Sequence, residues 1–210
     1  MMKLTWHGHA CFQIEEDGRS VVCDPYEPGF VPGLTDMAVT ADAVFCSHQH
    51  GDHNYVQGVT LNGTGECPFS LTVVDCWHDD TCGSQRGPNR IHIFDLPSGL
   101  RAVHLGDLGH LLTEEQAAVI GTPDVLMIPV GGFFTIGPAE AKAVCDALKP
   151  RIIVPMHFRA ASFGFDVIGP AEDFTALFPA EAVMHSGSCQ LEITADTPPC
   201  VAVLTPHFLA

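Results

Sequence analysis

The feature that most constrains the fold is a repeated pattern of short apolar runs bounded by turn-forming residues, which is typical of β-strands. Residues 43–46 are the clearest run, because they are apolar throughout, as a strand buried on both faces should be. Further runs with strand character are 3–7, 10–15, 20–24, 71–75, 91–96, 101–105, 125–130, 151–155, 190–194 and 201–205. Many short strands combined with few helices predict a layered α/β fold.

Signals for helices occur at three places in the second half of the chain. Thr113 followed by Gln116 is the sequence signature of a capping box, ahead of an Ala/Val/Ile face. Pro138 suits the first position of a helix that continues through 139–148. A third helix is expected to start at Pro170 and to run through 178.

Composition and charge narrow the class of protein. With 46% hydrophobic and 16% charged residues, the 210-residue chain can bury a substantial core. No repeat or low-complexity linker divides it, so residues 1–210 are expected to form a single domain. The net charge of −16 argues against a sequence-independent nucleic-acid-binding protein, which needs a basic face to displace counterions.

The cysteines and the apolar segments bear on the compartment. None of the nine cysteines forms a C-x-x-C pair, and several lie in apolar runs, so we expect reduced thiols and a cytoplasmic protein. The N-terminus has no apolar signal-peptide core. No stretch approaches the ~18 uninterrupted apolar residues of a membrane span. A small-molecule substrate is therefore expected, and a homo-oligomer remains an open alternative.

A dense cluster of metal-binding side chains follows the apolar run 43–46. The string Ser47-His48-Gln49-His50-Gly51-Asp52-His53 places three imidazoles and a carboxylate within six residues on a tight turn. Imidazole and carboxylate are the ligands of transition-metal sites. A turn can direct alternate side chains inward, so the string predicts a metal centre at the end of a core strand.

This string resembles the signature H-x-H-x-D-H of the metallo-β-lactamase superfamily, and the resemblance extends over nearly the whole chain. The other matching segments are Asp24-Pro25, His78, 104–107 and His157. Residues 104–110, 128–135 and 155–157 resemble the small stand-alone hydrolases of the superfamily, related to ascorbate-6-phosphate lactonases and phospholipase-D-like enzymes. The resemblance implies a four-layer αββα sandwich with metals at one edge between the sheets.

The resemblance also implies a dinuclear metal centre. Its first metal would be held by His48, His50 and His78, its second by Asp52, His53 and His157, with Asp107 between the two. His104 competes with His78, because the string after His78 departs from the usual pattern of the superfamily. Two divalent ions, zinc first and manganese or iron as alternatives, can share a water and hold it as hydroxide near neutral pH. Asp52 would also orient that water.

Residues for substrate binding are predicted from their position near the metal edge. Arg86, Asn89 and Arg159 could contact an anionic group, since arginine suits phosphate and carboxylate. His9 is either a residue that supports the ligands or a structural histidine, and His7 and His110 are left undecided. These features together predict a hydrolase acting on a small ester, lactone or phosphodiester.

Rival functions belong to other classes. A di-iron oxidoreductase on the same scaffold would reduce dioxygen or nitric oxide. Such proteins usually carry a carboxylate between the first two histidines, where this chain has Gln49, and an additional flavin domain. A metal-dependent binding module does not need an open dinuclear site, and a nuclease is disfavoured by the net charge of −16.

Overall fold

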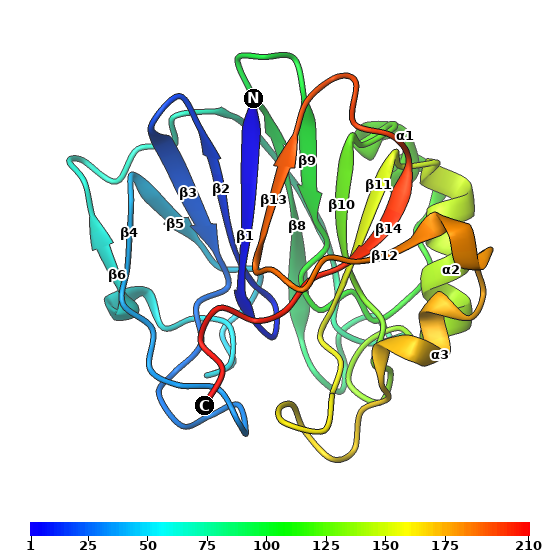
Figure 1. The fold of residues 1–210 in the computed structure, drawn as a ribbon. Coiled ribbons are helices and arrows are strands. Elements are labelled where there is room, and N and C mark those ends of the chain that lie inside the picture. The colour runs from blue at the N-terminus through cyan, green and yellow to red at the C-terminus, as the bar shows by residue number, and fades with distance from the viewer.

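The computed structural model describes residues 1–210 and contains two large β-sheets that face each other (Figure 1). The first sheet has five strands in the order β13-β1-β2-β3-β5. Their bounds are β1 (Met2–Gly8), β2 (Cys11–Glu16), β3 (Arg19–Cys23), β5 (Ala43–Phe45) and β13 (Gln190–Ile193). Neighbouring strands are antiparallel except β3 and β5, which run parallel.

The second sheet has seven strands in the order β12-β14-β11-β10-β9-β8-β7. Their bounds are β7 (Ser70–Trp77), β8 (Pro88–Asp95), β9 (Arg101–His104), β10 (Val125–Pro129), β11 (Ile152–Met156), β12 (Val183–His185) and β14 (Cys200–Val203). Only β8 runs against the others. Strands β7, β9 and β11 therefore end at the same edge of the sheet.

The helices lie beside the seven-stranded sheet in Figure 1. They are α1 (Glu114–Ile120), α2 (Pro138–Leu148) and α3 (Ala171–Thr175). Of the two short 3₁₀ turns, η2 (Ala180–Ala182) follows α3, and η1 (Val56–Gly58) directly precedes β6. On the side of the five-stranded sheet lies a two-stranded ribbon of β4 (Val39–Ala41) and β6 (Val59–Leu61). None of the helices combines the length and apolarity needed to cross a bilayer.

Each strand expected from the sequence overlaps an observed strand, and the short strands β4, β6 and β12 were not predicted. Helix α1 begins with the predicted capping box, in which Thr113 and Gln116 bond each other's backbone N–H. Helix α3 is shorter than expected. Its backbone tightens to i→i+3 hydrogen bonds at Leu177 and Phe178 before Pro179 ends the segment.

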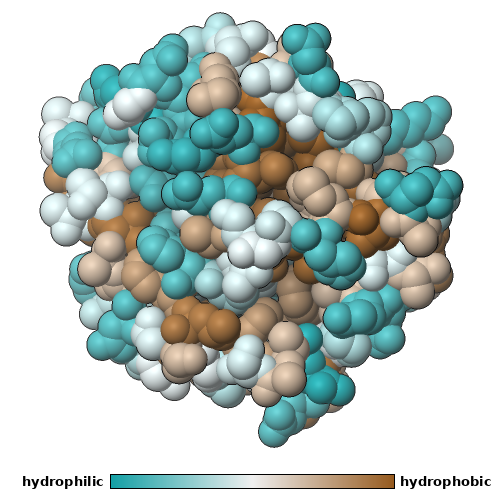
Figure 2. Space-filling view, in the orientation of Figure 1, coloured by the Kyte–Doolittle hydropathy of each residue, from teal (hydrophilic) through white to brown (hydrophobic).

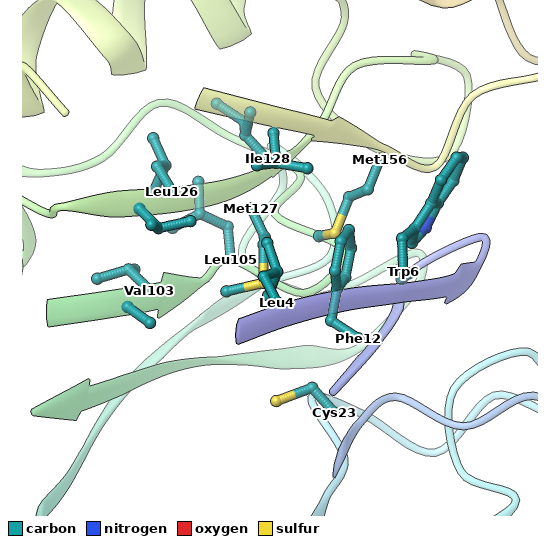
Figure 3. Close-up of a cluster of buried hydrophobic side chains, with 14 of the residues drawn as sticks. Leu4, Trp6, Phe12, Cys23, Val103, Leu105, Leu126, Met127, Ile128 and Met156 are labelled. Atoms are coloured by element: carbon teal, nitrogen blue, oxygen red, sulfur yellow. The ribbon is translucent and has the colours of Figure 1, made fainter. Parts of the chain in front are cut away.

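The core lies between the two sheets. One cluster of 52 buried hydrophobic residues draws on both of them. In Figure 3, Trp6 and Phe12 from the first sheet lie close to Met127 and Met156 from the second. On the face shown in Figure 2, hydrophilic and hydrophobic residues are interspersed, as is usual for the surface of a globular protein. Packing of this core holds the strand ends, and the loops that follow them, in a defined arrangement.

Candidate metal centre

The loop after β5 is anchored on Asp24, a fully buried residue that directly follows β3. Its carboxylate accepts hydrogen bonds from the backbone N–H and the hydroxyl of Ser47, both at 2.6 Å, and from Nδ1 of His53 at 2.9 Å. Because the Ser47 hydroxyl donates to Asp24, its oxygen accepts from Nδ1 of His48 at 2.9 Å. Both histidines thus carry their proton on Nδ1 and direct a free Nε2 lone pair elsewhere.

Those free Nε2 atoms face the carboxylate of Asp107, which follows β9. Its Oδ2 atom lies 3.2 Å from Nε2 of His53, 3.2 Å from Nε2 of His78 and 3.2 Å from Nε2 of His157. Nε2 of His48 is 3.9 Å away. One carboxylate oxygen therefore stands among four imidazoles that come from three different strand ends.

The potential ligand atoms form overlapping groups whose members lie within 4.8 Å of one another. These groups are His48, His50 and His78; His48, His53 and Asp107; and His9, Asp52, His53 and His157. The structure thus brings together all seven residues that the sequence predicted as ligands and adds His9 to them.

Several atoms of this cluster are buried without any hydrogen-bond partner. They are Nε2 of His48, Nε2 of His53, both ring nitrogens of His157, Nδ1 of His9, Nδ1 of His78 and Oδ1 of Asp107. An unpartnered buried polar group costs about 1–3 kcal/mol, so this many at one place needs an explanation. The Nε2 atoms of His48, His53 and His157, which face Oδ2 of Asp107, fit a divalent metal ion.

The protonation states also suit a metal. Burial, together with the charge of His53, lowers the pKa of His48 to about 3, so this imidazole is neutral at pH 7. Burial opposes ionisation of Asp107, but His157 and His53 hold the pKa of its carboxyl well below the usual range. Burial likewise opposes charging of His53, yet the carboxylates of Asp107 and Asp52 raise its pKa well above 6.5. The carboxylates thus attract positive charge to Nε2 of His53. In the metal-free protein this charge is a second proton, which a bound cation would replace.

The structure separates His78 from its competitor His104. Nε2 of His104 lies 2.8 Å from the carbonyl oxygen of Ala10, and its Nδ1 accepts the N–H of Gly106 at 3.1 Å. Both ring nitrogens of His104 are therefore engaged in holding the fold. His78 lies directly after β7 with Nε2 toward Asp107, so the geometry favours His78 as the candidate ligand.

His9, which the sequence left between two interpretations, contacts the candidate ligands directly. Its Nε2 lies 3.2 Å from Oδ2 of Asp52, and the centre of its ring lies 4.0 Å from that of His157. It is 1% exposed, and its φ of 52° is unusual for a residue other than glycine. In the sequence, the His-Gly-His string of residues 7–9 was the only signal that His9 contacts the candidate ligands.

A cavity of about 490 Å³ opens onto this cluster. It is lined by Phe30, Gln49, His50, Gly51, Asp52, His78, Arg86, Asp107, Phe134 and Phe165. Arg86 belongs to the loop after β7, and its Nη2 donates to the carbonyl oxygen of Phe133 at 3.0 Å. The predicted position of Arg86 beside the metal edge agrees with this geometry.

Two of the predicted substrate-binding residues lie elsewhere. Asn89 is fully buried because β8 starts earlier than expected and includes it. Its Nδ2 donates to the carbonyl oxygen of Leu105 at 2.9 Å, and its Oδ1 accepts the N–H of Asp107 at 3.0 Å. Asn89 therefore positions Asp107 and does not face the cavity. Arg159 does not line the cavity either, and its Nε donates to the carbonyl oxygen of Ile168 at 2.7 Å.

The two undecided histidines have structural contacts. His7 is buried beside the C-terminal segment, with Nδ1 3.4 Å from Nδ1 of His207. Nε2 of His110 accepts the backbone N–H of Trp77 at 3.1 Å. Neither residue belongs to the groups of potential metal ligands.

Comparisons with known proteins agree with this fold. The family model of the "Beta-lactamase superfamily domain" matches residues 3–157. A solved structure from Thermotoga maritima, of a protein assigned to the Zn-dependent hydrolases of the metallo-β-lactamase superfamily, aligns with a TM-score of 0.76. It is 36% identical in sequence, and the alignment covers 97% of this chain and 98% of that one.

Curated proteins with the name "UPF0173 metal-dependent hydrolase" are also similar. One from Nitratidesulfovibrio vulgaris (strain DP4) is 27% identical, with 90% of each chain covered. Another from Archaeoglobus fulgidus is 27% identical over 75% of this chain and 83% of its own length. The chain belongs to the metallo-β-lactamase superfamily, and the predicted α/β sandwich of the metallo-β-lactamase fold is confirmed, although the side of the five-stranded sheet carries the β4–β6 ribbon and the short turn η1 instead of an α-helix.

Proposed function

We propose that this protein hydrolyses a small ester, lactone or phosphodiester at a dinuclear metal centre. The coarser activity, metal-dependent hydrolysis, follows from superfamily membership and from similarity to metal-dependent hydrolases. The observation that carries the finer proposal is the position of Asp107 Oδ2, 3.2 Å from three imidazole nitrogens that belong to both predicted ligand sets. A carboxylate in that position can bridge two cations and reduce their repulsion.

We assign one ion to His48, His50 and His78 and the other to Asp52, His53 and His157, with Asp107 between them. Five imidazoles with two carboxylates favour zinc, and iron or manganese are the alternatives. When bound, such ions supply an activated water near neutral pH and polarise the carbonyl or phosphoryl oxygen of the substrate. The free Nε2 atoms of His48 and His53 support this assignment.

The protein's own residues have two further roles in this proposal. Asp52 lines the cavity, and its carboxylate can accept a hydrogen bond from the attacking water and orient it. His9 holds that carboxylate from behind through its Nε2, at 3.2 Å. Arg86 lines the same cavity and can donate to an anionic group of the substrate.

The remaining expectations form part of the same proposal. A cavity of about 490 Å³ suits a small molecule rather than a polynucleotide. All nine cysteines are free, which supports a reducing compartment such as the cytoplasm. The single core cluster supports one hydrolase domain over residues 1–210. Closeness to ascorbate-6-phosphate lactonase-like enzymes remains a prediction.

The deciding experiment combines elemental analysis with hydrolysis assays. Protein purified without added metal should contain about two zinc or manganese ions per chain. It should hydrolyse at least one member of a panel of phosphodiesters, thioesters and lactones, lose that activity on chelation and regain it when metal is returned. Full activity after complete chelation would contradict the proposal, and two iron ions without hydrolysis would favour the di-iron oxidoreductase.

A further inference from the structure

Three phenylalanines from three different loops line one wall of the cavity. Phe30 lies between β3 and β4, Phe134 between β10 and α2, and Phe165 between β11 and α3. The Phe165 ring stands nearly perpendicular to both others, at 85° to Phe30 and 74° to Phe134, with ring centres 6.3 and 6.0 Å apart. Edge-to-face pairs of this kind are a favourable aromatic arrangement.

These rings are held in place but are not buried in the core. Phe30 is 43% exposed, and Phe134 and Phe165 are half-buried. The Phe30 ring lies against the ligand loop where Gly51 has no side chain, since a Cβ there would come within 2.7 Å of the ring. The Phe165 ring packs edge-on against His9 at 5.5 Å. The wall is therefore preorganised, and its apolar faces remain available to a ligand.

The cavity also contains one cation, Arg86, whose guanidinium lies 5.8 Å from the centre of the Phe134 ring. In this acidic chain, six of the nine Lys and Arg side chains lie within 4 Å of a carboxylate, namely Lys3, Arg19, Arg90, Arg101, Lys142 and Arg151. Arg86 has no carboxylate partner, although 25 acidic residues are available in the chain. Its charge is therefore free for an anion in the cavity.

We propose that the substrate carries an aryl group beside an anionic group, with the ring against Phe30, Phe134 and Phe165 and the anion toward Arg86. This inference rests on the proposed hydrolase function, because it assumes that the cavity beside the ligand cluster receives the substrate. Edge-to-face contact with a fixed aromatic wall selects a flat ring over a puckered or short alkyl group. The cavity volume of about 490 Å³ restricts the substrate to a compact molecule.

The test uses binding of three phosphonates to the zinc-loaded protein, measured by calorimetry at a pH where all three are dianions. Phenylphosphonate, cyclohexylphosphonate and methylphosphonate share the same anionic group, so differences in affinity come from the organic group. Phenylphosphonate should bind about tenfold more tightly than methylphosphonate, the equivalent of about 1.4 kcal/mol, and about threefold more tightly than cyclohexylphosphonate.

Variants locate the effect in the wall. Phe165→Ala and Phe134→Ala should each reduce the preference for phenyl over methyl to less than about threefold. Circular dichroism and elemental analysis show in each case that the variant is folded and loaded with zinc. Leu177→Ala is the control, because this exposed side chain does not line the cavity, so the preference should stay about tenfold. Arg86→Gln should weaken all three ligands by the same factor.

Equal affinity for phenylphosphonate and methylphosphonate in the unmodified protein would overturn the inference. So would a phenyl preference that neither Phe165→Ala nor Phe134→Ala reduces. Either result alongside metal-dependent hydrolysis of the ester panel would refute the aryl selectivity and leave the hydrolase function standing. A phenyl preference located in the wall, in a protein that hydrolyses nothing on that panel, would support the aryl site and count against the proposed function.

Discussion

Among single residues, Asp24 has the widest influence on the candidate centre. Its carboxylate binds His53 directly and reaches His48 through the Ser47 hydroxyl. Burial opposes its ionisation, but the charge and hydrogen bond of His53 hold the pKa of Asp24 far below its usual value. One ionised carboxylate thus sets the tautomer of one histidine in each proposed ligand set.

Replacement of Ser47 by alanine tests this relay. Ser47→Ala removes the acceptor for His48 Nδ1 and leaves the bond between Asp24 and His53 intact, so one of two metal-binding steps should weaken by about 10–100-fold. Zinc titration of the metal-free protein followed by calorimetry measures both steps. Ser70→Ala, at an exposed position on β7, is the control and should behave like the unmodified protein. Two unaltered binding steps in Ser47→Ala would show that the hydroxyl has no such role.

Asp107 is predicted to be essential for metal content and dispensable for the fold. Asp107→Asn keeps the size of the side chain and removes the negative charge from the centre of the imidazoles, so metal content should fall below one ion per two chains. That threshold is about a fourfold loss from two ions. Elemental analysis and circular dichroism measure the two quantities separately. Full metal occupancy in Asp107→Asn would contradict the bridging assignment.

His92 lies outside the metal centre and should make the fold sensitive to acid. Burial against Phe45 and Phe94 lowers its pKa to about 4, whereas its pKa in an unfolded chain is 6.5. The unfolded chain therefore binds this proton first as the pH falls. The contribution of the neutral His92 ring to the free energy of unfolding is therefore complete above pH 6.5. It is lost progressively between about pH 6.5 and about pH 4.

His92→Leu should reduce this sensitivity. The free energy of unfolding should fall in both proteins when the pH is lowered from about 7.5 to about 5. The decrease should be about 2 kcal/mol smaller in His92→Leu than in the unmodified protein. Urea denaturation of metal-free protein at both pH values measures the difference. The exposed His185 provides the control variant His185→Leu. Equal pH dependence in His92→Leu and the unmodified protein would refute the prediction.

At the scale of elements, the loop between β7 and β8 is organised by Asp79. Its two carboxylate oxygens accept the backbone N–H groups of Thr81, Gly83, Gln85 and Arg86 and the hydroxyl of Thr81. Burial acts to raise the pKa of Asp79, but these hydrogen bonds lower it far below its usual value. The loop that places Arg86 at the cavity therefore depends on one ionised side chain.

Asp79→Asn should loosen this loop without affecting the metal ligands. An amide group would turn a donor toward N–H groups that need an acceptor. Hydrogen exchange at residues 81–86 should accelerate, and affinity for methylphosphonate should fall because Arg86 moves. Asp80→Asn is the matched control, since Asp80 is exposed. Unchanged exchange at 81–86 in Asp79→Asn would show that the loop is held in another way.

At the scale of the whole molecule, the candidate centre joins the two sheets. His48 and His53 follow a strand of the five-stranded sheet, whereas Asp107 and His157 follow strands of the seven-stranded sheet. A cation held by both groups would act as a link across the open edge of the sandwich. The shared core of 52 buried residues should nevertheless keep the metal-free protein folded.

Metal removal should therefore lower stability without unfolding the chain. With free zinc at 100–1,000 times its dissociation constant, each ion that binds only the native state adds about 3–4 kcal/mol to the free energy of unfolding. Denaturant unfolding with and without a chelator measures this difference. Asp107→Asn should respond little to the chelator, because it holds little metal. Identical unfolding midpoints with and without chelator in the unmodified protein would exclude such a link.

The sequence alone determined all strands except β4, β6 and β12, and the position of the candidate ligand loop, because these depend on neighbours along the chain. Alternation of apolar runs with turn residues predicts the strands, and the spacing of His48, His50, Asp52 and His53 is itself a local geometry. Resemblance then added His78, Asp107 and His157. None of this required knowledge of which strands pair.

Only the tertiary structure decided which distant side chains meet. The register of β8 places Asn89 in the core behind Asp107, and contacts with Ala10 and Gly106 occupy both ring nitrogens of His104. The packing of loops places His9 on Asp52 across 43 positions of sequence and brings Phe30 and Phe165 together. These contacts depend on strand pairing and on the packing of two sheets, which no short stretch of sequence encodes by itself.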